Sequence, residues 1–365
     1  MKLLRHFGLF LLACLLGIMP LHAAGEEVAG EKSTVDVQEI VFGHIRDAYE
    51  WHLFTLGEKH VSIPLPVIVY SQTTGWHAFS SSRLGHGAEY EGFHIASEGS
   101  YAGKVVETTP DGQEVRPLDI SITKTALSLM INSLLLVLIM VGVARWYKNR
   151  KPSSEAPKGF VGFMEMFVMM IHDDVIVSCV GKDYKRFAPY LLTAFFFIFI
   201  NNLMGLVPIF PGGGNVTGNI AITLFLALMT FLAVNIFGTK EYWKEIFWPD
   251  VPTWLKVPVP FMPVIELFGV FTKPFALTVR LFANIMAGHA IILSLVSIIF
   301  ITASLGAVLS TSMTILSVLF SIFMSCLEIL VAFIQAYVFT MLSAVFIGLS
   351  RVRHEEHVGS VQPAV

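Results

Sequence analysis

Charged side chains are scarce in this chain of 365 residues, where Asp, Glu, Lys and Arg together make up only 14%. Soluble domains carry about 25% of such residues. Apolar residues take their place: they reach 55%, with 30 Phe and 15 Met, and the mean hydropathy is +0.69. A soluble globular domain is therefore excluded, because so much apolar surface must face lipid.

The chain also has no excess of basic residues and few cysteines. A net charge of −3 and a pI near 6.5 argue against a nucleic-acid-binding protein. The three cysteines, Cys14, Cys179 and Cys326, are too few for a disulfide framework, and their spacing fits no metal motif. The sequence thus indicates an integral membrane protein, with no cofactor, metal or nucleic acid expected.

Residues 1–24 have the pattern of a secretory signal peptide. Lys2 and Arg5 precede an apolar stretch, and the small residues Ala23 and Ala24 offer a cleavage site. An uncleaved membrane anchor, or lipid attachment at Cys14, are the alternatives. Each reading places the segment that follows outside the cytoplasm.

Residues 25–120 are polar and predict a small extracytoplasmic region that contains β-structure. Its strand-like run, 61–70, holds Pro64 and Pro66, which suit an edge strand or an extended segment rather than a central strand. The histidines of this region match no compact ligand motif and are interpreted as polar surface: His44, His52, His60, His77, His86 and His94.

The membrane domain is predicted at residues 121–350. Five hydrophobic blocks there each exceed the ~20 residues that cross a bilayer: 123–145, 187–210, 218–239, 262–300 and 308–350. The last two are long enough to require strong tilt and are expected to form an antiparallel hairpin. The predicted fold class is an all-α integral membrane protein with five spanning helices and a small β-containing N-terminal region.

Basic residues predict the orientation of these spans. Lys and Arg follow the first, third and fifth blocks, whereas the 210–218 turn has none. The positive-inside rule then puts the N-terminus outside and the tail, residues 351–365, in the cytoplasm. Between the first two spans, 158–185 predicts an amphipathic helix that packs on lipid or on a partner helix.

Ionisable residues within the last two blocks are the functional candidates. From 281 to 350 only His289 and Glu328 are strongly ionisable, and Arg280 directly precedes that stretch. The free-energy cost of a charged group in a bilayer is high, so such residues are interpreted as functional. The alternative for Arg280 is an arginine at a helix end that extends to the membrane interface. Helical spacing adds two polar stripes: Glu266, Lys273, Arg280 and Asn284 on one helix, Glu328 and Gln335 on the other.

The run Arg280-Leu-Phe-Ala-Asn284-Ile-Met-Ala-Gly288-His289 resembles the signature of subunit a of the rotary F-type ATP synthase. The resemblance covers roughly 118–350, and includes 187–208 with Asn202. It implies a non-catalytic proton channel of two offset half-channels against a ring of c subunits, in the bacterial inner membrane, with b subunits as further partners. Many bacterial members have Glu in place of His289 and His in place of Glu328.

The resemblance makes Arg280 the essential arginine and Asn284 and Gln335 its polar neighbours. His289 and Glu328 are expected to relay protons in the outer half-channel, because His289 lies ~13 Å beyond Arg280 along an outward-running helix. Glu266 suits the cytoplasmic half-channel. Proton and sodium selectivity stay open, and so do the role of the extracytoplasmic region and the ring stoichiometry.

The spacing of the two stripes also predicts a register for the hairpin. In an antiparallel hairpin, the numbers of paired residues add up to a nearly constant sum. By this rule Arg280 pairs with Gln335 and His289 with Glu328, and the turn is expected near Gly306 to Val308. Nine residues separate Arg280 from His289, so a regular helix would point them to opposite faces, Arg280 toward the ring and His289 toward the last helix. Both pairs can face the same partner only if the helix bends between them, and Gly288 is the candidate site of such a bend.

Two other classes of protein are the alternatives. A stand-alone ion channel or secondary transporter would also carry Arg, His and Glu in its bundle, but the chain lacks the internal repeats that transporters commonly show. A membrane anchor for an enzymatic extracytoplasmic domain lacks any nucleophile motif or Gly-rich phosphate loop.

Overall fold

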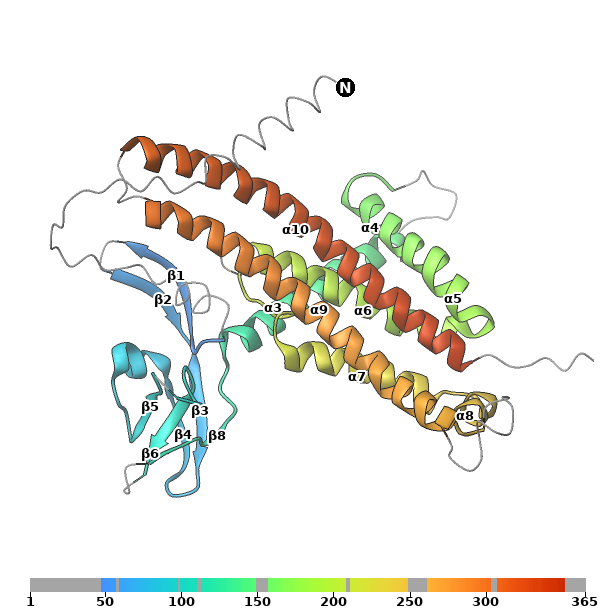
Figure 1. The fold of residues 1–365 in the computed structure, drawn as a ribbon, viewed down its shortest axis with the longest axis horizontal. Helices are drawn as coiled ribbons and strands as arrows, with labels where there is room; N and C mark the ends of the chain where they lie inside the picture. The colour runs from blue at the N-terminus through green and yellow to red at the C-terminus, as the bar shows by residue number, and fades with distance from the viewer. Residues whose placement is uncertain are drawn as a thin grey trace, which may run out of the picture. The chain divides into compact units, whose positions relative to one another are not determined.

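A computed structural model describes residues 47–56, 59–97, 99–109, 113–148, 157–207, 211–248, 261–302 and 307–351 (Figure 1). The predicted signal peptide, 1–24, and the tail beyond Arg351 lie outside these residues. The fold is mainly helical and begins with a small β region. The predicted combination of a helical protein with a β-containing N-terminal region is therefore confirmed.

The β region consists of three small antiparallel sheets. β1 (Glu50–Leu56) pairs with β2 (Lys59–Pro64). β3 (Pro66–Ser71) lies between β4 (Gly75–Ser80) and β8 (Leu118–Asp119). β6 (Val105–Thr108) lies between β5 (Phe93–Ile95) and β7 (Glu114–Val115), and the short helix η1 (Ser81–Gly87) follows β4.

The expectation of an edge strand or an extended segment at 61–70 holds for β2, which pairs with β1 alone among the described strands, and is wrong for β3. The chain forms two strands there, and β3 is the central strand of its sheet. Pro66 is tolerated because it is the first residue of β3, where its lack of an N–H breaks no ladder inside the strand. Its carbonyl still accepts a hydrogen bond from Ile122 N–H (3.2 Å).

A buried tyrosine packs in the core of the β region and links it to β8. Tyr49 packs among Val67, Val69 and Phe93, and its hydroxyl donates to the Asp119 carboxylate. Burial, together with this hydrogen bond, raises the pKa of Tyr49 above its ordinary value. The hydroxyl therefore keeps its proton and its hydrogen bond at neutral pH, and it joins β8 to the core.

Helices make up the rest of the described chain. The first helices are α3 (Lys124–Lys148), α4 (Phe160–Met169), the π-helical η2 (Met170–Val177), α5 (Ser178–Val180), the short turn η3 (Gly181–Asp183) and α6 (Tyr184–Leu206). They are followed by α7 (Ile220–Ile236), α8 (Lys240–Phe247), α9 (Phe261–Thr302) and α10 (Ala307–Ser350).

Four helical stretches of the described chain are long and apolar enough to cross a membrane. They are α3, the run 160–206 that ends with α6, and most of α9 and α10. α7 and α8 pass the same test only as a pair, bent by 100°, and would then make a fifth span. Spanning helices are thus supported, and the number five stays a prediction.

The predicted amphipathic segment 158–185 is helical and has one buried face. Phe167, Ile171, Val175 and Ile176 are buried in the helical core, whereas Phe163 and Met166 are exposed. η2 packs on α6 and α10. Of the two predicted partners, lipid or a helix, the buried face therefore meets helices of the same chain.

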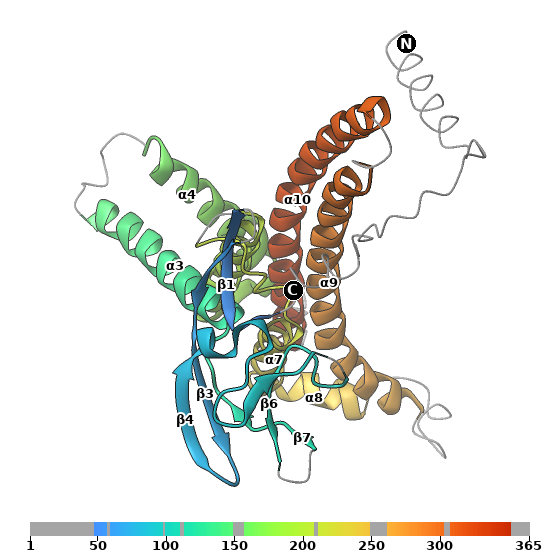
Figure 2. The same ribbon diagram turned by 90° about the vertical axis from the view of Figure 1, so that its left-hand side faces the viewer.

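α9 and α10 run side by side along their length (Figures 1 and 2). Pairs along the two helices identify an antiparallel arrangement: the Ser317 hydroxyl donates to the Leu295 carbonyl, and Lys273 lies over the ring of Phe346. The predicted turn is shifted, because Ala307 and Val308 already belong to α10. The connection is thus confined to 303–306, whose structure lies outside the described residues.

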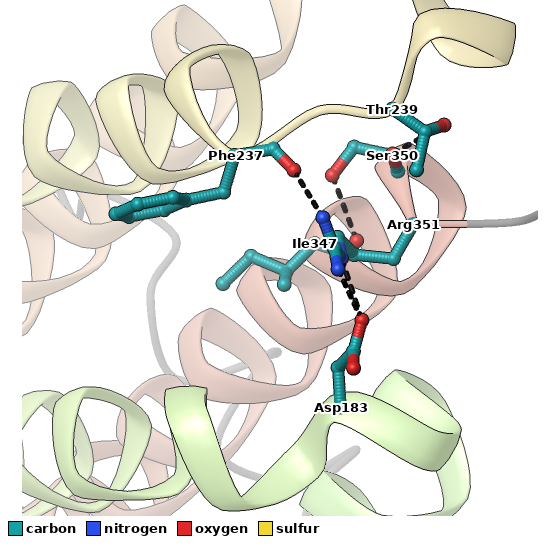
Figure 3. A network of polar contacts seen from close by, with 6 residues as sticks. All are labelled: Asp183, Phe237, Thr239, Ile347, Ser350 and Arg351. Carbon is teal, nitrogen blue, oxygen red and sulfur yellow. Dashed lines mark hydrogen bonds and ion pairs between the residues drawn. The ribbon is translucent and has the colours of Figure 1, made fainter.

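A polar clamp holds the end of α10 (Figure 3). Arg351 donates from Nε to the Asp183 carboxylate (2.8 Å) and from Nη1 to the Phe237 carbonyl (2.8 Å). In addition, Thr239 N–H donates to the Ser350 carbonyl (2.9 Å). The clamp joins the C-terminal end of α10 to the start of α6 and to the corner between α7 and α8.

Candidate functional site: a buried His–Glu pair and an exposed arginine

α9 is regular between the two predicted functional positions. It forms one α-helix through Pro274 and Gly288, without a break between Arg280 and His289. Arg280 is accordingly exposed, whereas His289 points toward α10. This is the outcome expected for a regular helix, because nine residues at 100° each bring the two side chains to opposite faces.

His289 and Glu328 meet between α9 and α10, as the register predicted for the hairpin requires. His289 Nδ1 lies 3.2 Å from Glu328 Oε1, and the Glu328 side chain is only 6% exposed. The contact is an ion pair and not a hydrogen bond, and neither carboxylate oxygen has a hydrogen-bond partner in the described part of the chain. A buried carboxylate without a hydrogen-bond partner is energetically costly, which marks this position as a functional one.

Gly288 leaves space that the pair occupies, and Gly205 lies next to it. A Cβ atom at Gly288 would lie 2.7 Å from Glu328 Oε1, closer than real Cβ contacts. A Cβ atom at Gly205, near the end of α6, would lie 3.6 Å from His289 Nε2. The His–Glu pair is therefore enclosed by α9, α10 and α6, and Gly288 brings the Glu328 carboxyl directly against the α9 backbone.

Buried amides continue from this pair into the bundle. Asn202 of α6 donates from Nδ2 to the carbonyl of Ala332 (3.2 Å), one turn beyond Glu328, and its Oδ1 accepts from the Thr217 hydroxyl (2.7 Å). The neighbouring Asn201 accepts at Oδ1 from Asn132 Nδ2 of α3 (3.0 Å). These four polar side chains are all at most 3% exposed.

One atom of this amide group lacks a partner. Asn132 Oδ1 is buried and accepts no hydrogen bond within the described residues. Buried polar groups are satisfied by protein or by ordered water in nearly all proteins. The unmet acceptor therefore marks a position that suits water inside an otherwise apolar bundle.

Arg280 lies on a different face of α9. Arg280 and Asn284 are exposed, whereas Leu277, Leu281 and Ile285 are buried against the rest of the bundle. Neither Arg280 nor Asn284 has a hydrogen bond or ion pair from its side chain to the described part of the protein. Gln335 is buried on α10, whereas Arg280 is exposed, and the two predicted partners make no polar contact with each other.

The remaining members of the α9 stripe lie nearer its N-terminal end. Glu266 is exposed, and Lys273 is half-buried with its ammonium 5.5 Å from the centre of the Phe346 ring. Lys273 also lines a cavity of about 10 Å³ together with Asn235 and Tyr242. Asn235 Oδ1 and the Tyr242 hydroxyl are buried without a hydrogen-bond partner in the described chain. The cavity has room for about one water molecule.

Sequence reasoning found the ionisable residues and Asn202 but missed Asn132, Asn201 and Thr217. Asn132 was detectable as a lone amide in the apolar run of α3, since an amide in a membrane helix seeks a polar partner. Its partner, 69 residues away, is fixed only by the packing of α3 on α6. Gly205 was missed for the same reason, and Gly288 was considered only as the candidate site of a bend, which α9 does not show.

Known proteins share both parts of this chain. The family described as ATP synthase A chain matches residues 129–348, and a domain of unknown function matches residues 40–121. "ATP synthase subunit a" of Chlorobium phaeobacteroides is 41% identical over 309 residues, which cover 80% of this chain and 85% of that protein. "ATP synthase subunit a" of Chloroherpeton thalassium is 44% identical over 251 residues, or 67% of this chain and 70% of that protein.

A multi-pass membrane subunit with a buried His–Glu pair and an exposed arginine is the class that fold and site define. The chain belongs to the family of ATP synthase subunit a. It is the proton-channel subunit of the membrane sector and a part of the ATP synthase complex.

Proposed function

We propose that Arg280 separates two offset half-channels that this chain forms against a rotating ring of c subunits. The observation that carries the proposal is the division of α9 into two functional faces. Arg280 is exposed and unpaired within the described chain on one face, whereas His289 is enclosed with Glu328 on the other. A free guanidinium suits a carboxylate on a partner, and an enclosed His–Glu pair suits proton transfer.

The ring carboxylate supplies the chemistry that Arg280 acts on. A charged carboxylate cannot face lipid cheaply, so it takes up a proton before it leaves the subunit interface. Opposite Arg280 the carboxylate is favoured as the anion, and its proton is released into one half-channel. The fixed positive charge blocks direct passage of protons from one half-channel to the other. Arginine suits this task because it stays protonated.

The outer half-channel, in this proposal, leads to His289 and Glu328. The buried amides Asn202, bonded to the Ala332 carbonyl one turn from Glu328, and Asn201, bonded to Asn132 of α3, supply further polar groups near that pair. The inner half-channel passes Glu266 and Lys273, and the small cavity with the unmet polar atoms of Asn235 and Tyr242 supports water on that side. Gln335 and Asn284 complete the polar lining between the two.

The proposal also fixes orientation and partners. α3 enters from outside, after a signal peptide at 1–24, and α10 ends in the cytoplasm of a bacterium, with five spans in the inner membrane. Support comes from the basic residues of the sequence, which follow the first, third and fifth apolar blocks. b subunits of the peripheral stalk hold the chain still while the ring turns. Catalysis of ATP synthesis takes place on other subunits.

Accessibility to a thiol reagent tests the direction of the relay. With Cys14, Cys179 and Cys326 replaced, His289→Cys or Glu328→Cys is expected to react with a membrane-impermeant reagent added from outside. Lys148→Cys, at the predicted cytoplasmic end of α3, serves as the control and is expected to react only from inside. Labelling of positions 289 and 328 only from the cytoplasm would overturn the assignment of the outer half-channel.

Gly288→Ala tests the close approach of Glu328 to α9. The added methyl group would lie 2.7 Å from Glu328 Oε1, so we expect the carboxyl to move and proton-driven ATP synthesis to fall by about tenfold or more. Alanine is a better helix former than glycine by about 1 kcal/mol, so the complex is expected to assemble. The matched control is Gly269→Ala on the same helix, where a Cβ meets nothing within 4 Å. Equal synthesis rates in the two variants would contradict the prediction.

A further inference from the structure

The sheet β4-β3-β8 has an unusual outer face. Val67, Val69 and Phe79 point from its inner face into the core of the β region. The alternate residues form what we call the outer sheet face: Pro66, Ile68, Tyr70, Trp76, Ala78, Ser80, Leu118 and Ile120. Antiparallel sheets commonly show polar residues on the face turned from the core. The outer sheet face carries no charged residue at these positions.

Its largest side chains are well exposed and are held in place by the strand pairing. Trp76 is 61% exposed, Leu118 60% and Ile120 54%. Tyr70 pairs across the strands with both Trp76 and Leu118, and the Tyr70 and Trp76 rings lie 5.0 Å apart. An exposed apolar patch of this kind indicates a binding surface. Its uncharged, aromatic and aliphatic chemistry suits a contact that is not electrostatic.

The sheet is joined to the first spanning helix without a linker. Beyond β8 the chain continues along β3, because Ile120 N–H donates to the Ile68 carbonyl (3.0 Å) and Ile122 N–H to the Pro66 carbonyl (3.2 Å). α3 begins two residues later at Lys124, whose N–H donates to the Ala48 carbonyl (2.8 Å). Leu118 is thus six residues from the start of a spanning helix, at most ~20 Å at the rise of a strand.

We propose that the outer sheet face rests on the bilayer, with Trp76, Tyr70, Leu118 and Ile120 in the lipid headgroup region. Trp and Tyr are enriched at membrane interfaces, where one part of the ring is apolar and the other wet. The hydrogen bonds to Ile68, Pro66 and Ala48 keep the sheet within reach of the membrane surface that α3 enters. Since the face is uncharged, the contact requires no anionic lipid. The inference goes beyond the proton path and rests only on α3 spanning the bilayer.

Fluorescence quenching in the complete ATP synthase complex tests this contact. The complex is reconstituted in phosphatidylcholine vesicles after replacement of Cys14, Cys179 and Cys326, and Leu118→Cys is labelled with an environment-sensitive fluorophore. The matched control is Glu89→Cys, exposed in the loop after η1. We expect lipids with a doxyl group near the top of the acyl chain to quench the probe at position 118, and aqueous iodide to quench the probe at position 89.

The outcomes separate lipid from water and from protein. Quenching of the probe at position 118 by iodide and not by doxyl lipid would show a solvated face and overturn the proposal. Protection from both quenchers would show that another subunit covers the face, which overturns it as well. Ala78→Cys on the neighbouring strand repeats the measurement, so that a local disturbance at one position cannot decide the result. ATP synthesis by the labelled complexes shows that the proton path is intact.

Discussion

Arg280→Ala is expected to abolish proton-driven ATP synthesis while the complex still assembles. The Arg280 side chain is exposed and makes no polar contact with the described residues, so its removal leaves no packing defect. In the proposed mechanism, the Arg280→Ala variant lacks the positive charge that attracts a ring carboxylate. Two unit charges about 4 Å apart attract by about 4 kcal/mol at an effective dielectric constant of about 20. This energy corresponds to roughly a thousandfold change in an equilibrium constant.

The measurement combines ATP synthesis with passive proton uptake in vesicles. We expect synthesis to disappear and protons to leak through the membrane sector, because the fixed charge between the half-channels is gone. Arg280→Lys is also expected to fail, since an ammonium enclosed between this chain and the ring can lose its proton and lacks the planar guanidinium. The control Arg145→Ala, at the exposed end of α3, is expected to synthesise ATP normally. Normal synthesis by assembled Arg280→Ala complexes would refute the role of the arginine.

Exchange of the buried pair is expected to rescue two inactive single variants. His289→Glu would place a second carboxyl beside Glu328, and Glu328→His a second imidazole beside His289, within the present 3.2 Å contact. Two carboxyls that share a site hold on to one proton, so the relay is blocked. Each single variant is expected to lower synthesis on the order of a hundredfold, the typical contribution of a positioned proton donor or acceptor. The double variant restores one carboxyl and one imidazole, and with them much of the activity.

A second His–Glu pair in the same chain offers the matched control. His77 and Glu91 lie 2.6 Å apart in the β region, where His77 lowers the pKa of the Glu91 carboxyl through a hydrogen bond. His77→Glu and Glu91→His are expected to leave ATP synthesis unchanged. A double variant at positions 289 and 328 that is no more active than its single variants would show that the two residues do not act as a pair.

The sequence predicted the parts of the site that depend on helix periodicity. Apolar blocks located α3, α6, α7, α9 and α10 to within a few residues, and the register predicted for an antiparallel hairpin paired His289 with Glu328. Helical spacing also predicted that Arg280 and His289 point apart. All three inferences use local geometry, which a regular helix preserves over many turns.

Contacts between distant segments were beyond this reasoning. The central position of β3 depends on β8, which is about 50 residues further along the chain and only two residues long. Asn132 and Thr217 are marked as polar by the sequence, but their partners Asn201 and Asn202 follow from how α3 and the loop before α7 pack on α6. The role of Gly288, which lets the Glu328 carboxyl approach the α9 backbone, likewise depends on the distance between α9 and α10. That distance cannot be predicted from a residue pattern.

The α9–α10 hairpin is supported like a beam fixed at one end. From Glu328 onward α10 has many buried residues and ends in the Arg351 clamp, whereas Ser317 is the single buried residue between 311 and 327. In the proposed mechanism, a sideways load from the ring would be transmitted along the hairpin to the clamped end, and the deflection would grow with distance from the clamp. Arg280, flanked by the buried Leu277 and Leu281, sits in the stiff part. His289 and Glu328 lie where the well-buried part of α10 begins, so the proposed relay pair would be displaced by such bending more than Arg280.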